Sequence, residues 1–185
     1  MPDCTRQVWN FWKRRRWTAC ISASQLLHTE HAVAAWTEDQ CVRGEAVCLT
    51  EEEAQKLLDA KERNHVQVMV GQVVRSFDEY RYLKDCYETG RYGELKSITM
   101  QRVSGDAAWG FEDWFHKEDR SGSVVLDLHV HDLDFLRYML GEPDSFDVRA
   151  TAFSSGMINQ IFTTYEFGKV FAVTEESGIS VQRFL

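Results

Sequence analysis

This sequence lacks the features that would assign a protein to a membrane, to nucleic acid or to the secretory pathway. Its 185 residues contain no apolar run long enough to span a bilayer, and the N-terminus has no apolar core of the signal-peptide kind. The formal net charge is -8, so the protein would repel phosphate groups. We therefore expect a cytoplasmic protein that binds neither nucleic acids nor membranes.

The cysteines show no pattern of disulfides or zinc ligands. There are five of them, with no CxxC spacing and no histidine at the spacing of a zinc finger. An odd number without such spacing indicates reduced thiols. There is also no internal repeat or low-complexity tract. With 44% hydrophobic residues, the chain can bury a core large enough for one domain and part of another.

Residues 124–143 place acidic and imidazole groups within an otherwise apolar segment. In a helix, the spacings of Asp127, His131 and Asp134 put all three side chains on one face. Most of the remaining circumference is apolar, so we expect this helix to be largely buried. Its polar groups must then find partners or take part in chemistry.

The spacing alone leaves several interpretations of this segment open. A buried Asp–His pair is a candidate acid/base device, although a core histidine bonded to a carboxylate is more common. His129 and His131 also have the HxH spacing that a strand can present to zinc. The amidohydrolase barrels that use such a pair need roughly 200 residues after it, whereas this chain ends at Leu185, which disfavours a metal-dependent hydrolase. We expect His129 and Asp132 to lie nearer to solvent or to bond to the backbone.

From Thr50 onward, local signals predict alternating helices and strands. Thr50 and Glu53 form a capping box, which begins a helix that ends at Asn64-His65. The apolar stretch 66–70 is typical of a buried parallel strand. The later predicted elements are a helix from about Asp78 to Gly90, a strand over 95–103, the helix containing Asp127 and closed by Gly141 and Pro143, a strand from Phe146, a hairpin of 157–167 and 169–174 that turns at Gly168, and a strand from Ile179.

Four segments, taken in this order, carry a family resemblance: LTEEEAQKLLDA, VQVMVGQVVR, FDEYRYLKDCYETGRYGEL and SGSVVLDLHVHDLDFLRYMLGEP. About residues 47–185 resemble the Gfo/Idh/MocA family of NAD(P)-dependent oxidoreductases, which includes glucose-fructose oxidoreductase and inositol 2-dehydrogenase. The resemblance implies an α/β fold, in which the remnant of a Rossmann-type parallel sheet precedes a mostly antiparallel open sheet with helices on one face. Residues 26–75 would be the remnant of the nucleotide-binding domain. Residues 76–185 would be an α/β substrate domain that is incomplete at its C-terminus.

The resemblance also implies roles for particular residues. The DxxxH motif of the family falls on Asp127 and His131. His131 would then be the acid/base group for a substrate hydroxyl, and Asp127 would orient the imidazole or the substrate. The implied substrate is a sugar, cyclitol or related polyol, the cofactor is NAD or NADP, and the assembly is a homo-oligomer formed through the sheet. The further residues assigned are Trp114, His116, Asp134 and Arg75 for substrate binding and Gly71 for cofactor binding.

Two family features of the cofactor-binding half are missing. No GxGxxG follows a strand, and Gly44-Glu45-Ala46 stands where the family has the lysine of an EKP motif. We expect residues 1–25 to be irregular, and we hypothesise that residues 1–46 are partly a frameshifted translation, since suitable codons for 43–46 spell Glu-Glu-Lys-Pro in another frame. The chain would then be a fragment, truncated at both ends, with little activity by itself. A catalytically inactive binding or dimerisation module is the alternative.

Overall fold

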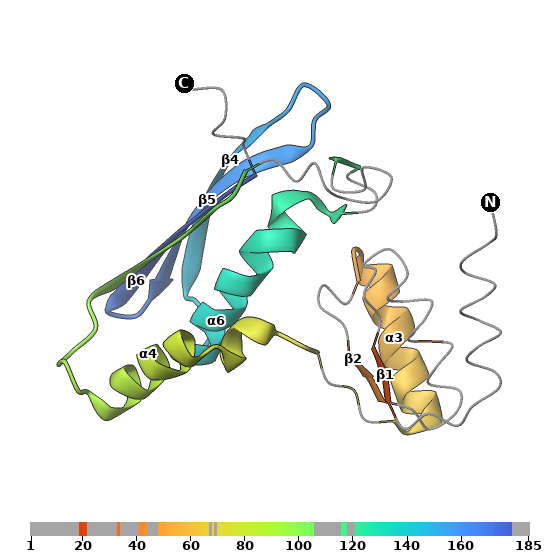
Figure 1. Cartoon of the computed structure of the whole chain (residues 1–185), viewed down its shortest axis with the longest axis horizontal. Coiled ribbons are helices and arrows are strands. Elements are labelled where there is room, and N and C mark those ends of the chain that lie inside the picture. The colour runs from red at the N-terminus through yellow and green to blue at the C-terminus, as the bar shows by residue number, and fades with distance from the viewer. Residues whose placement is uncertain are drawn as a thin grey trace. The chain divides into compact units, whose positions relative to one another are not determined.

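The computed structural model describes residues 19–21, 33, 41–43, 48–66, 68, 70–105, 116–117 and 121–178. The chain divides into two compact units, Met1–Gly71 and Gln72–Leu185, and each is described by itself (Figure 1). Across the described ranges, no helix combines the length and the apolar content that crossing a bilayer requires.

The first unit contains a short pair of parallel strands. β1 (Ala19–Ile21) pairs with β2 (Cys41–Arg43), which agrees with the predicted remnant of a parallel sheet. β1 lies within residues 1–25, where no strand was expected. Its backbone partners come from β2, more than twenty positions further along the chain, and local sequence patterns do not reveal such pairing.

The helix α3 (Glu51–Asn64) has the predicted bounds. The backbone N–H of Glu53 donates to the side-chain oxygen of Thr50 over 3.2 Å, and the carboxylate of Glu53 accepts from the N–H of Leu49 over 2.8 Å. The first bond satisfies a donor that the helix start leaves free. The second differs from a standard capping box, because the carboxylate bonds Leu49, one residue before the N-cap Thr50. His65 ends the helix in the left-handed region with φ 52°.

The strand predicted over residues 66–70 is wrong at the described positions Val66, Val68 and Val70, none of which lies in a strand. Val70 is 43% exposed. Among the described residues, no strand pairs with this segment. An extended apolar run becomes a strand only where a neighbour accepts its backbone hydrogen bonds, so apolar composition was insufficient evidence.

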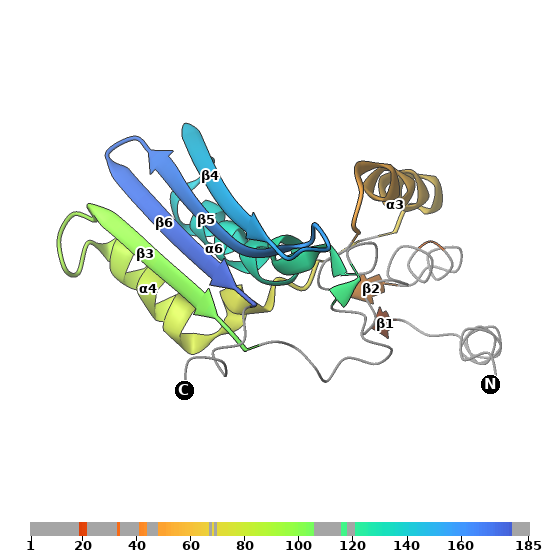
Figure 2. The same cartoon turned by 90° about the horizontal axis from the view of Figure 1, so that it is seen from above.

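The second unit is a four-stranded sheet with helices on one face. Its strand order is β3-β6-β5-β4, in which β3 and β6 are parallel and the other two pairs are antiparallel. Figure 2 shows α4 and α6 on the same side of this sheet. The predicted fold class is therefore confirmed. In chain order the elements are η3 (Val73–Ser76), α4 (Asp78–Thr89), β3 (Ser97–Val103), η5 (Val125–His129), α6 (Val130–Leu140), β4 (Ser145–Ala152), β5 (Ile158–Phe167) and β6 (Val170–Ser177).

The alternation of residues in β5 decides which face the helices cover. Every second residue from 159 to 167 is buried, and the residues between them are half-buried or exposed. Gly168, with φ 62°, makes the predicted hairpin turn into β6. On the covered face, Leu136 of α6 packs in a core cluster with Tyr165, Phe167 and Ala172. The main core of this unit thus lies between α6 and the sheet.

The predicted helix around Asp127 differs from a regular α-helix at its start. Val125–His129 form a π-turn, in which the N–H of Val130 donates to the carbonyl of Val125, five residues earlier. α6 then runs to Leu140, and Gly141 follows it with φ 91°. The extra residue in this turn changes the angular relation between side chains before and after it, so the 3.6-residue spacing does not hold across the junction.

Candidate active site

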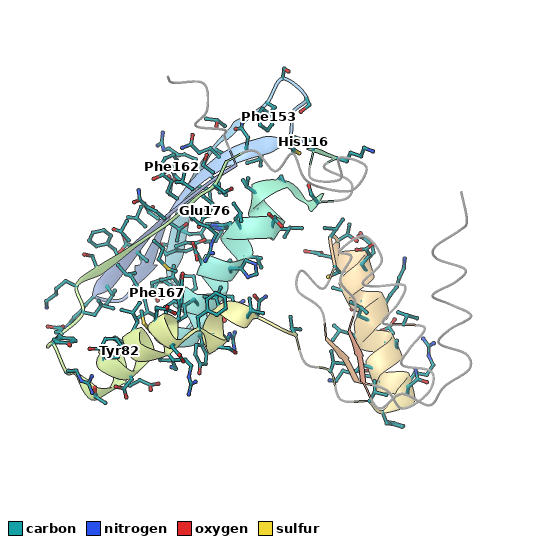
Figure 3. All side chains as sticks on the ribbon, viewed as in Figure 1. Tyr82, His116, Phe153, Phe162, Phe167 and Glu176 are labelled. Carbon is teal, nitrogen blue, oxygen red and sulfur yellow. The ribbon has the colours of Figure 1, made fainter. Side chains whose placement is uncertain are left out.

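A cavity lies at the start of the central helix of the second unit. Its walls come from the end of β3, the segment before η5, η5 itself and the region that joins β4 to β5. Figure 3 shows His116 and Phe153 at this end of the unit. A lining that mixes hydroxyl, amide and carboxyl groups with an aromatic ring suits a small polyhydroxylated molecule. The polar lining residues are Ser104, His116, Ser121, Ser123, Asp127 and Asn159, and the apolar ones are Val124, Leu128, Phe153, Met157 and Ile158.

The structure brings two predicted site residues, Asp127 and His116, to the same cavity. His131 is not part of the lining and lies in the first turn of α6. It is half-buried, and its Nδ1 is buried without a hydrogen-bond partner among the described residues. A buried nitrogen in this condition is a site where a ligand or water would form a hydrogen bond. Trp114 lies outside the described residues.

We predicted that His129 lies nearer to solvent or bonds to the backbone. It is instead buried, with 6% of its surface exposed. Its Nδ1 lies 2.8 Å from Oε2 of Glu176 in β6, and its Nε2 lies 2.7 Å from the hydroxyl of Tyr165 in β5. The reason is its position on the helix. His129 precedes Leu133 and Leu136 by four and seven residues, and both leucines pack in the core against the sheet.

Asp132, also expected near solvent or bonded to the backbone, is 1% exposed. Its Oδ1 accepts a hydrogen bond of 2.6 Å from Nη2 of Arg102 in β3. Burial by itself lowers the pKa of Arg102, but the hydrogen bond to Asp132 and its negative charge outweigh burial, so the pKa is raised. The pair joins β3 to α6 because a buried carboxylate requires a partner.

Two of the residues predicted to bind substrate, Arg75 and Asp134, are bonded to each other. Nε and Nη2 of Arg75 donate to the two carboxylate oxygens of Asp134, both over 2.6 Å. These hydrogen bonds raise the pKa of Arg75. The guanidinium carbon also lies 4.6 Å from the centroid of the Tyr138 ring. Substrate binding by this pair stays a prediction, and it would have to use the donors that Asp134 leaves free.

The metal interpretation required a strand that presents His129 and His131 together. Both residues lie in a helix instead, and both ring nitrogens of His129 already have partners. Within the part of the chain that the structure describes, no three His, Cys, Asp or Glu side chains are grouped so as to hold a metal ion. The premise of the hydrolase interpretation is therefore wrong.

Glu176, which is absent from the residues predicted for the site, is fully buried beside the central helix (Figure 3). In β6 the residues Ala172, Thr174 and Glu176 alternate with more exposed neighbours and face the helix. A charged residue at an inward position of an alternating strand must have a buried partner, which is the signal that could have revealed it.

A model of the GFO/IDH/MocA C-terminal domain matches residues 80–182. The chain belongs to this family. The matched region begins in α4 and contains β3, the π-turn, α6 and the hairpin, so the Asp127–His131 segment lies inside the GFO/IDH/MocA domain. The family resemblance drawn from the order of these segments is confirmed.

Several GFO/IDH/MocA relatives can be compared with this chain. The curated 1,5-anhydro-D-fructose reductase of Ensifer adhaerens is 26% identical over 170 residues, which cover 88% of this chain and 48% of the reductase. An NAD-binding protein from Listeria innocua has the same fold, with a TM-score of 0.78, 23% identity, and coverage of 94% of this chain and 52% of that protein. Myo-inositol 2-dehydrogenase from Lactobacillus plantarum gives a TM-score of 0.74, 19% identity, and coverage of 92% and 54%. The chain thus spans about half the length of these relatives.

Proposed function

We propose that this chain is the substrate-binding part of an oxidoreductase that acts on a CH–OH group of a sugar, cyclitol or related polyol, with NAD or NADP as the hydride carrier. The observation that supports this most is the cavity at the start of the central helix, where a few polar groups lie among apolar side chains. Asp127 lies in its wall, and His131 lies four residues further along the helix, with a buried nitrogen that no described residue bonds. The named substrates of the relatives, 1,5-anhydro-D-fructose and myo-inositol, are of the same chemical class.

In this proposal His131 accepts the proton of the substrate hydroxyl during oxidation and donates it back in the reverse reaction. Imidazole is the side chain best suited to moving a proton near neutral pH, and a positioned acid/base group contributes roughly 10²- to 10⁴-fold to a rate. Asp127 accepts hydrogen bonds from substrate hydroxyl groups and so orients them. The apolar wall formed by Phe153, Met157 and Ile158 contacts the carbon skeleton.

The described residues do not fit a dinucleotide. Such a cofactor needs a glycine-rich turn and a helix N-terminus free to receive its phosphates. The helix of the first unit, α3, carries Glu51, Glu52 and Glu53 in its first turn, which would repel them. Gly71 follows no strand at the described positions. The roles proposed for this chain are therefore substrate binding and proton transfer, and we expect it to bind NAD(H) or NADP(H) no more tightly than about 1 mM by calorimetry.

Substrate binding can be tested on the chain itself with myo-inositol. In an NMR titration we expect shift changes at Asp127, His116 and Asn159, which line the cavity. Exposed residues of α4 such as Asp78 and Glu88 should not respond. Shifts spread evenly over the domain, or absent from the cavity, would contradict the assignment.

Proton transfer requires a chain fused to an intact nucleotide-binding half, with the EKP lysine restored before Thr50. In that fusion we expect polyol oxidation that His131→Gln slows by roughly 10²- to 10⁴-fold. Asp127→Asn should also slow it. The control is His65→Asn, because His65 is exposed and caps α3. If His131→Gln lowers stability without a separate loss of turnover per folded molecule, His131 is structural.

A non-catalytic binding or dimerisation module is the second candidate. It is favoured by β4, in which all eight residues are exposed and which lies at the edge of the sheet that the described residues form. Such an edge offers free backbone groups to another chain. Myo-inositol binding without turnover in the fused enzyme would support this alternative.

A further inference from the structure

The π-turn η5 connects the candidate cavity to the buried core. Asp127 lies in the middle of the turn and faces the cavity, while His129 ends the turn and faces the sheet. His131 follows two residues later. π-turns are frequent at functional sites, and their rarity indicates that they are less favourable than regular α-helical turns. Some other interaction must therefore stabilise this one.

His129 supplies such an interaction, since two strands hold its ring. Nδ1 contacts Glu176 of β6 over 2.8 Å, and Nε2 contacts the Tyr165 hydroxyl of β5 over 2.7 Å. The His129 and Tyr165 rings are also nearly parallel, at 15°, with centroids 6.2 Å apart. The hydroxyl of Thr174 donates to the same carboxylate oxygen of Glu176 over 3.4 Å. The ring is thus fixed at both nitrogens.

The chemistry of the partners determines the direction of these bonds. A carboxylate only accepts, so Nδ1 of His129 carries a hydrogen and donates it to Glu176. Burial raises the pKa of Tyr165 to about 12, and its hydroxyl keeps its proton. That hydroxyl donates to Nε2 of a neutral ring or accepts from Nε2 of a protonated one. Either charge state of His129 preserves both contacts.

Glu176 is a costly residue for this position if stability is its only role. It is fully buried, and its Oε1 has no hydrogen-bond partner among the described residues. A buried carboxylate with one unbonded oxygen generally makes the folded protein less stable than an apolar residue of similar size would. The feature that Glu176 does provide is a directed bond to a single ring nitrogen at the end of the π-turn.

We propose that His129 is a positioning residue, held by Glu176 and Tyr165, that maintains the π-turn so that Asp127 faces the cavity while His131 follows on α6. The inference relies on the proposed function only for the roles of Asp127 and His131. It predicts that the geometry of the turn depends on the acceptor at position 176 more than on the overall stability of the domain.

The test is amide hydrogen exchange and NMR on the full chain. The reporters are the Val130 amide, which makes the π-type hydrogen bond, and the side-chain carboxyl signal of Asp127. We expect Glu176→Leu to speed Val130 exchange by roughly tenfold or more and to shift the Asp127 signal. Glu176→Gln should restore both, because its amide oxygen accepts from Nδ1–H. The shift changes that myo-inositol causes at Asp127 should be lost and restored in parallel.

A stability control separates positioning from general loosening. Met139→Ala removes a buried side chain from α6 that packs with Val74 and Phe135, in a core cluster without Tyr165, and should destabilise the domain without changing the Asp127 signal. Where Glu176→Leu does not fold, Tyr165→Phe removes the hydroxyl contact alone and should give a smaller change in the same direction. Unchanged reporters in both variants, or equal changes in Met139→Ala, would overturn the proposal. If myo-inositol fails to bind the parent chain, the proposed function fails, whereas the exchange rates still decide the role of His129.

Discussion

Asp132 holds the guanidinium of Arg102 against the inner face of the sheet, and removing that carboxylate takes away the counter-charge that is hydrogen-bonded to it. Asp132 is 1% exposed and the side chain of Arg102 is 28% exposed. We expect Asp132→Ala to lower the free energy of unfolding by about 3 kcal/mol, toward the lower end for buried pairs because Arg102 reaches some solvent.

Urea denaturation measures this change, and the matched control is Asp147→Ala. Asp147 pairs with Arg149 over 3.6 Å, with both side chains largely exposed. That variant should differ from the parent by less than about 0.5 kcal/mol. Equal losses in the two variants would show that the Asp132–Arg102 pair contributes no more than a surface ion pair.

Tyr165 makes the free energy of unfolding of the domain depend on pH in the alkaline range. Burial raises its pKa from the ordinary value of 10.0 to about 12. The folded state therefore retains the phenol proton where the unfolded state has lost it. This stabilisation is fully present below pH 10 and is lost as the pH rises toward 12.

Absorbance titration of the tyrosinates can follow this process. Of the six tyrosines, we expect a fraction in the folded protein to ionise late, and this fraction should shrink in Tyr165→Phe. The same substitution should flatten the loss of stability between pH 10 and 12. Ionisation of all six phenols in one step near pH 10 would contradict the burial of Tyr165.

Gly90, at the end of α4, and Gly122, shortly before η5, both have positive φ, but only Gly122 lacks space for a side chain. Gly90 ends α4 with φ 63°, and an added Cβ would meet nothing within 4 Å. Gly122 has φ 66°, and an added Cβ would lie 2.8 Å from Cβ of Leu126, in the turn that leads into η5. The backbone conformation is comparable at both sites. The difference in stability between alanine variants at the two positions therefore measures the cost of the steric overlap with Leu126.

We expect Gly90→Ala to lower the free energy of unfolding by about 1 kcal/mol and Gly122→Ala by roughly 3 kcal/mol. Denaturant titration of both variants provides the comparison. Gly122→Ala should also disturb the NMR signals of the cavity residues Ser121 and Asp127, whereas Gly90→Ala should not. Equal costs would mean that Leu126 moves aside freely.

The face of the sheet opposite the helices carries exposed aromatic side chains. Phe162 is 41% exposed and Phe171 is 49% exposed, and both alternate with residues of the inner face. The predicted homo-oligomer would bury this face. Introducing charge there should weaken association, because a buried unpaired lysine is unfavourable.

We therefore expect Phe162→Lys and Phe171→Lys to shift sedimentation toward a smaller species, with more than a tenfold weaker association. Phe146→Lys is the control. Phe146 is more exposed, at 67%, but lies on the helix side of the edge strand, opposite Tyr165. A stronger effect of Phe146→Lys would place the interface at the β4 edge rather than on the open face.

Much of the architecture follows from signals within a few residues of each other. The Thr50–Glu53 cap, the stops at His65 and Gly90, and the hairpin turn at Gly168 all depend on local backbone and side-chain geometry, and the structure contains each of them. The DxxxH segment, taken together with the order of the segments before it, identified the family, because both are read along the chain.

The partners of the polar side chains were decided by tertiary structure. His129 meets Glu176 across 47 positions of sequence, and Arg75 meets Asp134 across 59. Helical spacing can place a residue on a face, but it does not state which strand will cover that face or which charge that strand carries. The apolar run at 66–70 also shows that local pattern is insufficient. Its described residues do not form a strand, because no described strand lies beside them to share backbone hydrogen bonds. Packing and long-range hydrogen bonds, which no local pattern contains, therefore determined which histidine is buried in the core and which has a ring nitrogen without a partner among the described residues.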